Sequence, residues 1–220
     1  MAAIPIGWTT WTAPPVFSFQ DLFYTRPTNT TNLGSNWDRG PPATRDFEVN
    51  EASLVAAGKY GAYWNAAGSP PWGSALVSTT IRAVWGNNIR ATGVFGGRGP
   101  FSNVSSYIGP LVRWTGTEGY FAAGIANDDG ITVSGTIRRV TWNGSAYSHS
   151  SLGSVAWGDT SPTPAYTFEV FGNELKLYDG AGVLRLSVTN TLIPSGSRVG
   201  IWAIRDSGFN ILNSVKFEEY

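Results

Sequence analysis

Few side chains in this sequence have the types and spacing that chemistry requires. His149 is the only histidine, and cysteine is absent. A Ser–His–Asp arrangement around His149 is formally possible, but no Gly-x-Ser-x-Gly elbow accompanies it. The lack of cysteine excludes disulfides, thiolate metal sites and a cysteine nucleophile. We therefore predict a protein without catalytic residues, in which His149 is an exposed polar residue of a strand.

One acidic stretch could hold a cation. Asn127-Asp128-Asp129-Gly130 offers oxygen ligands of the kind that calcium prefers, so Asp128 and Asp129 are weak calcium candidates. Asn, Asp and Gly are also the residues that a tight turn requires. The turn is the favoured interpretation, and we predict no metal site and no cofactor.

Aromatic residues are in excess: 10 Trp, 9 Tyr and 11 Phe. Aromatic rings can stack on sugar faces, and they are also favoured at protein interfaces and in cores. The candidates for exposure lie beside predicted turns: Trp64, Trp72, Trp114, Tyr120, Trp142, Tyr147 and Trp157. Each has a core position as its alternative. Trp72 is the most suggestive, because prolines precede it in Gly68-Ser69-Pro70-Pro71-Trp72.

The first 18 residues differ from the rest of the chain, because they are uncharged and interrupted by prolines. Their large apolar residues form a candidate docking arm: Ile4, Ile6, Trp8, Trp11 and Phe17. The segment could be a terminal cover on its own domain, or an arm that docks on a neighbouring subunit. Tryptophans on a free arm would expose an apolar patch, so some surface is expected to receive them.

Charge excludes several classes of partner. The 220 residues carry 15 basic and 15 acidic side chains, a net charge of zero. Without a basic run, we expect no binding to nucleic acid or to an anionic membrane. No run of about 20 apolar residues occurs, and the N-terminus makes a poor signal peptide, so we expect a soluble, unprocessed chain.

Short apolar segments recur between Gly, Asn, Asp and Pro, as in an all-β sandwich. The predicted strands are Leu76–Trp85, Ile89–Phe95, Ile108–Trp114, Tyr120–Ala126, Ile131–Trp142, Tyr166–Phe171, Leu175–Tyr178, Val183–Val188, Arg198–Ile204 and Ile211–Phe217. Asn143-Gly144 predicts a hairpin with a type I′ turn. Gly172-Asn173 and Asp179-Gly180-Ala181-Gly182 predict further turns. We expect one antiparallel two-sheet domain over residues 19–220, preceded by the arm of residues 1–18.

Several motifs in order resemble a known family. They are Asp21-Leu22-Phe23, Leu33-Gly34-Ser35-Asn36-Trp37, Phe47 to Leu54, Gly109 to Trp114, Gly119-Tyr120-Phe121-Ala122, Phe168 to Gly180 and Val199-Gly200-Ile201. Together they resemble concanavalin A-like, laminin G-like jelly-roll domains over about residues 19–220. The version with the LGSNW opening is similar to domains of bacteriophage virion proteins and secreted bacterial proteins.

The resemblance implies a fold that hosts lectins, glycoside hydrolases and structural modules. The Glu-x-Asp-x-x-Glu strand of its hydrolases and the acidic and His metal cluster of its legume-type lectins are both absent here. We therefore expect a non-enzymatic bacteriophage virion protein: a capsid-decorating (cement) protein or a head or tail appendage. It would form a homo-oligomer, with a trimer favoured, and contact other virion proteins such as the major capsid protein. It would fold in the host cytoplasm and end on the virion surface. The alternatives are a carbohydrate-binding receptor-recognition module and, less favoured, a glycoside hydrolase.

Overall fold

The computed structural model describes residues 15–27, 33–39, 47–50, 61–64, 73–81, 83–98, 107–126, 132–156, 165–205 and 210–220. Within these ranges the regular structure is β-strand, apart from one turn of 3-10 helix, η1 (Phe23–Thr25). No helix in this part of the chain has the length and apolar character to cross a membrane.

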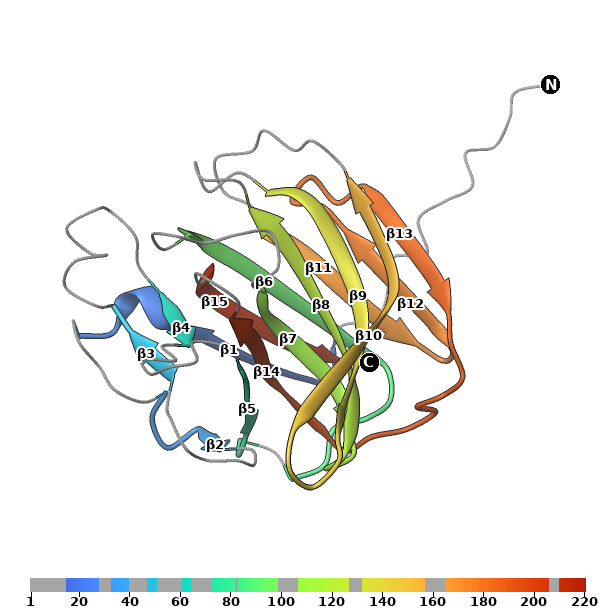
Figure 1. Cartoon of the computed structure of the whole chain (residues 1–220), viewed down its shortest axis with the longest axis horizontal. Coiled ribbons are helices and arrows are strands. Elements are labelled where there is room, and N and C mark those ends of the chain that lie inside the picture. Colours follow the sequence, from blue (N-terminus) through green and yellow to red (C-terminus); the bar gives the residue numbers. More distant parts are fainter. Residues whose placement is uncertain are drawn as a thin grey trace.

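The strands form two antiparallel sheets that face each other (Figure 1). Sheet A has the order β13 (Leu184–Thr189), β12 (Glu174–Tyr178), β11 (Ala165–Phe171), β6 (Ile89–Arg98), β15 (Asn210–Glu219), β4 (Ala62–Trp64) and β3 (Phe47–Val49), with β1 (Phe17–Leu22) also paired to β15. Sheet B has the order β10 (Tyr147–Ala156), β9 (Thr132–Trp142), β8 (Glu118–Ala126), β7 (Tyr107–Trp114), β14 (Arg198–Arg205), β5 (Gly73–Thr79) and β2 (Trp37–Arg39). The predicted all-β, two-sheet antiparallel sandwich is confirmed.

The predicted turns join the strands as expected, with one correction. Gly172 links β11 to β12 at φ 55°, and Gly182 closes the β12–β13 turn at φ 79°. The hairpin at Asn143-Gly144 exists, but Trp142 pairs with Tyr147, so its loop has four residues and is not a type I′ turn. Asn143 does not take a positive φ; instead its Oδ1 accepts hydrogen bonds from the backbone of Ser145 and Ala146. The side chain itself organises the turn.

One predicted strand is too long. The segment Leu76–Trp85 stops being a strand after Thr79, and Trp85 returns to the sandwich from a loop. Its indole is 2% exposed and packs edge-on between Phe17 and Phe217. Because the Trp85 ring is buried in the core, the loop after β5 carries a large apolar residue.

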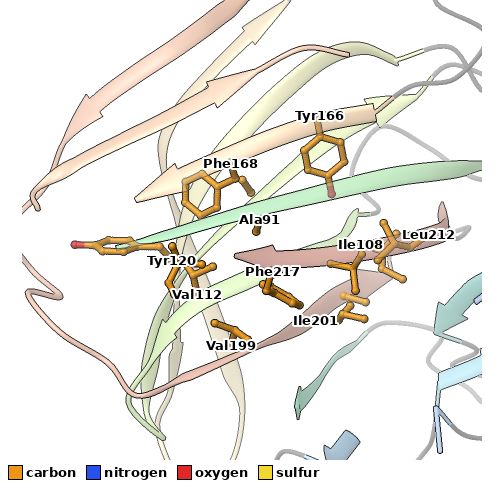
Figure 2. Packing of buried hydrophobic residues seen from close by; sticks show 14 of the residues in the cluster. Ala91, Ile108, Val112, Tyr120, Tyr166, Phe168, Val199, Ile201, Leu212 and Phe217 are labelled. Carbon is orange, nitrogen blue, oxygen red and sulfur yellow. The ribbon is translucent and has the colours of Figure 1, made fainter. Parts of the chain in front are cut away.

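The main core lies between the two sheets (Figure 2). Alternate residues of each strand point into it, as the period of a half-buried strand requires. On β11 these residues are Tyr166, Phe168 and Val170, and all three are fully buried. The Tyr166 ring covers Gly93 of the neighbouring strand, and its hydroxyl approaches Gly109 of sheet B. A side chain at either glycine would collide with this ring.

The predicted boundary after residue 18 is wrong, and so is the assignment of Phe17 to a docking arm. β1 begins at Phe17 and pairs with β15, and the backbone nitrogen of Val16 donates to the Glu219 carbonyl. The Phe17 ring lies 5.1 Å from that of Trp85. Phe17 is therefore part of the sandwich, because it completes the packing around the Trp85 indole.

Asn50 connects the segments around η1 to β4. Its Nδ2 donates to the carbonyls of Phe23 and Arg26 at 3.1 and 2.7 Å, and its Oδ1 accepts from the Gly61 nitrogen at 2.7 Å. Asn50 is 2% exposed and has φ 52°, a left-handed conformation that Asn tolerates better than most residues. One side chain therefore satisfies three buried backbone groups.

We predict that Asn50→Ala lowers the free energy of unfolding by about 3 kcal/mol, because it orphans buried backbone groups and strains the left-handed backbone. Urea unfolding would measure the loss. Asn50→Gly should remain destabilised, since glycine relieves only the strain, and the exposed Ser150→Ala should stay within about 0.5 kcal/mol of the wild type. An Asn50→Ala protein as stable as Ser150→Ala would contradict the role.

Candidate functional site

The outer face of sheet B, which is turned away from the main core, carries a second group of apolar side chains. On β14, Ile201 and Ala203 point into the main core, and Trp202 between them belongs to the second group. The buried members are Leu111, Trp114, Phe121, Ala123, Val140 and Trp202, with Tyr107, Trp142, Tyr147 and Ile204 packed against them. Sheet B is therefore apolar on both faces.

Sheet B curls over this second group. The ring of His149 on β10 lies 5.4 Å from the ring of Trp202 on β14, although β9, β8 and β7 separate these strands in the sheet. Phe121 packs edge-on against the same indole at 4.8 Å. β10 also approaches β5, and β9 and β10 bend strongly (Figure 1). The outer face is consequently concave.

Three aromatic residues gather where β7 and β9 end and β10 begins, and we call them the aromatic end of sheet B: Trp114, Trp142 and Tyr147. The Tyr147 ring lies 4.7 Å from Trp142 and 6.3 Å from Trp114, in each case tilted by 48°. Trp114 is buried, whereas Trp142 and Tyr147 are half-buried. Burial raises the pKa of Tyr147 well above its usual range, so its hydroxyl stays protonated. The aromatic end thus offers two partly accessible rings on a rigid support.

A polar group, the Arg138 cluster, lies on the same face and consists of Tyr107, Arg138, His149 and Trp202. Arg138 Nη1 lies 2.8 Å from His149 Nδ1, and Nη2 donates to the Tyr107 hydroxyl at 2.9 Å. Its guanidinium also stacks on the Tyr107 ring at 4.4 Å. Because a guanidinium can only donate, Nδ1 of His149 must accept, and the imidazole is neutral with its proton on Nε2. Burial and the charge of Arg138 lower the pKa of His149, in agreement with a neutral ring.

Most of the buried acidic residues in the described ranges are paired with arginines. The buried carboxylates of Asp21, Glu169 and Asp179 pair with Arg26, Arg90 and Arg185. Within the strands of sheet B the acidic residues are Asp38 and Glu118, and Glu118 pairs with Arg139 at 2.5 Å. No group of three or more His, Asp or Glu side chains that could hold a metal ion occurs in these ranges. What this face can do chemically is donate hydrogen bonds and offer rings.

Two of the aromatic residues predicted as candidates for exposure are buried. Tyr120 is a core residue between the sheets, where its hydroxyl donates to Asn190 Oδ1 at 2.7 Å and accepts from the Ile193 nitrogen at 2.9 Å. Trp114 is 2% exposed because Tyr147 packs over it. His149, expected as an exposed strand residue, is half-buried against Trp202. Trp142 and Tyr147 are half-buried, between the core position and the exposed position that the sequence left open.

The other predicted residues lie outside the described residues. These are Ile4, Ile6, Trp8 and Trp11 of the arm, Trp72 and Trp157 among the aromatic candidates, and the weak calcium candidates Asp128 and Asp129. The side chain of Trp64 is likewise not described.

Sequence reasoning missed Tyr107, Arg138 and Trp202. One signal was present: Arg138 shares its side of β9 with Val140 and Trp142, at a spacing of two residues. A charged residue in line with two large apolar residues indicates a cation on a partly buried face. No comparable signal exists for Trp202, which reads as an ordinary core residue of its strand.

No protein-family model and no curated protein sequence matches the chain. Solved structures do match it along most of its length. The structure of the Crh5 transglycosylase in complex with NAG matches with a TM-score of 0.55 and 9% identity, over 94% of this chain and 86% of that one. The carbohydrate recognition domain of Emp47p matches with a TM-score of 0.51 and 14% identity, over 92% and 94% of the two chains. LamAcat from Zobellia galactanivorans has a TM-score of 0.50 and 11% identity, over 94% and 98%. These similarities confirm the jelly-roll sandwich, as the resemblance to concanavalin A-like domains implied.

We predict that the free energy of unfolding falls as the pH is lowered from about 7.5 to 5.5, partly through His149. The folded state holds the pKa of His149 below its usual value, so the unfolded chain binds a proton at His149 more readily than the folded chain does. As the pH falls through about 6.5, this proton uptake stabilises the unfolded state relative to the folded state. In His149→Gln, which keeps a hydrogen-bond acceptor for Arg138, the loss between these pH values should be smaller. Urea unfolding of both proteins at each pH tests this, and equal losses would contradict it.

Proposed function

We propose that this chain is a non-catalytic saccharide-binding module whose contact surface is the concave outer face of sheet B. The observation that carries the proposal is the half-buried pair Trp142 and Tyr147, held 4.7 Å apart beside the β9–β10 turn. Flat aromatic rings stack on the apolar faces of sugar rings. Trp114 packs behind Tyr147 and holds its ring in position in the absence of a ligand. Such preorganisation lowers the entropic cost of binding.

The fold supports this proposal. The domain of Emp47p is a carbohydrate recognition domain, and the Crh5 structure contains NAG. Low identity makes these proteins guides to the fold only. The case for this chain therefore depends on its own aromatic end of sheet B.

The absence of enzymatic activity is part of the same proposal. Glycoside hydrolysis ordinarily needs two carboxyl groups about 5–9.5 Å apart on either side of the scissile bond. Within the strands of sheet B, Asp38 lies on the edge strand β2 and Glu118 is neutralised by Arg139. This arrangement supports binding in preference to the hydrolase alternative.

A second candidate is the virion structural role expected from the sequence. The observation that favours it is a set of exposed apolar residues at one end of the sandwich: Val16, Val84, Phe171 and Leu192, between 54% and 73% exposed. Hydrogen bonds to Asn88 place some of these segments together: the Gly172 nitrogen donates to its side-chain Oδ1, and the Tyr220 nitrogen donates to its backbone carbonyl. Residues 1–14 are separated from Val16 only by Pro15. In this candidate the end surface receives the arm of a second copy in a homo-oligomer, which would decorate a bacteriophage particle.

For the saccharide-binding proposal, we predict that Trp142→Ala weakens binding by about 2 kcal/mol, or roughly thirtyfold, since it removes a stacking ring. The measurement is a glycan array followed by calorimetry on the best saccharide. Tyr24→Ala is the matched control, because Tyr24 is 46% exposed and lies on η1, which packs against β2 at the edge of sheet B opposite β10. Equal affinities of the Trp142→Ala and Tyr24→Ala proteins, or no binding to any saccharide, would refute the proposal.

For the second candidate, we predict that a chain lacking residues 1–14 sediments as a folded monomer, whereas the full chain sediments as a trimer. Val84→Asp in the full chain should also dissociate the trimer, because a charge on the end surface opposes apolar docking. Arg139→Met, on sheet B, should leave the sedimentation unchanged. A full chain that is itself monomeric would count against this candidate.

A further inference from the structure

Within the described part of the chain, the Arg138 cluster has more hydrogen-bond donors than acceptors. A guanidinium carries five N–H groups, and Arg138 uses two of them, toward His149 and Tyr107. The neutral His149 accepts at Nδ1, so its Nε2 carries the proton and is a hydrogen-bond donor. The Tyr107 oxygen accepts from Arg138, so its own O–H also remains available. What the cluster still offers is therefore mainly N–H and O–H groups.

Two of these donors are buried. Nε of Arg138 and Nε1 of Trp202 have no hydrogen-bond partner within the described ranges, and Trp202 is 0% exposed. Its indole is in ring contact with His149. Buried donors are nearly always paired in folded proteins, and an exception in a native structure points to a missing partner.

Among the described residues, Arg138 has no carboxylate partner, in contrast to four other arginines. Arg26, Arg90, Arg139 and Arg185 each pair with a carboxylate. Arg138 pairs with no carboxylate in the part of the chain that the structure describes; its partners are a neutral imidazole and a phenol. A half-buried guanidinium held by neutral groups keeps its full positive charge for a ligand.

We propose that the Arg138 cluster is the subsite for the carboxylate of an acidic saccharide. This inference rests on the proposed function, since the same saccharide would stack on the aromatic end of sheet B. Carboxylate oxygens accept several hydrogen bonds each and match the guanidinium in a bidentate pair. His149 follows Tyr147 by two residues on β10, or about 7 Å along the strand. One short oligosaccharide therefore reaches both groups, with one sugar ring on the aromatic end and a neighbouring uronate on Arg138.

The experiment compares two probes that differ only in charge: tetragalacturonate and its fully methyl-esterified form, titrated into the full-length protein at fixed ionic strength. We expect the acid to bind about ten- to hundredfold more tightly than the ester, the range that one charged hydrogen-bonded pair contributes. In wild-type NMR spectra the acid, but not the ester, should shift the Arg138 Nε–H and Trp202 Nε1–H resonances. This readout needs no variant except Trp202→Phe, used only to assign the indole signal.

Arg138→Met and Arg139→Met form a matched pair of variants. Both remove one positive charge from adjacent positions of β9, but Arg139 lies on the opposite side of the strand and pairs with Glu118. Arg138→Met should remove the preference for the acid, and Arg139→Met should keep it. Arg138→Lys is the second variant in case the methionine protein does not fold; it keeps the charge but should lose most of the preference, because an ammonium cannot form the bidentate pair.

The outcomes separate this inference from the proposed function. If acid and ester bind equally and both depend on Trp142, saccharide binding stands and the carboxylate subsite is refuted. If inorganic phosphate or acetate shifts the two N–H signals as strongly as tetragalacturonate does, the cluster binds small anions and the saccharide assignment is overturned. If neither saccharide binds, the proposed function fails for this saccharide class and the subsite fails with it.

Discussion

Sheet B has apolar side chains on both faces, and much of the structure follows from the need to bury the second set. The inner face packs against sheet A, whereas the outer face has no further layer among the described residues. The sheet buries that face by curling, so that side chains of β10 reach β14 across three intervening strands. Trp202 at the centre of the curl is fully buried, which corresponds to a few kcal/mol of apolar transfer free energy.

The curl also creates the candidate site. It brings His149 against Trp202 and half-buries Arg138 at a place where none of the described carboxylates pairs with it. Toward the β9–β10 turn the same face opens, and Trp142 and Tyr147 keep part of their rings in solvent. A buried donor group and an exposed ring pair thus lie on one continuous surface. Neutral stacking and charge recognition are the two kinds of interaction that a binder of acidic saccharides has to combine.

Much of the fold was predictable from local patterns. Most predicted strands agree with the observed ones to within three residues at each end, because the alternation of residues and the turn residues between them are local signals. Asn143 shows where this reasoning stops: its identity predicted a turn, but its side chain caps a four-residue loop in place of the predicted type I′ geometry. The sequence pattern placed Trp85 in a strand, because the residue type of a core residue does not show whether it lies on a strand or on a loop.

The sequence alone determined the all-β class, the antiparallel connections, the absence of cysteine and the single histidine, since these depend on residue types and on neighbours along the chain. It also pointed to Trp142 and Tyr147, which flank a recognisable turn. Only the tertiary structure decided that Tyr120 and Trp114 are buried and that Arg138, His149 and Trp202 meet. In β8, Tyr120 and Phe121 are both apolar and fully buried, yet they face different clusters. When a strand has apolar side chains on both faces, the curl of the whole sheet decides how far each face is buried. That curl is set by contacts between residues more than 50 positions apart.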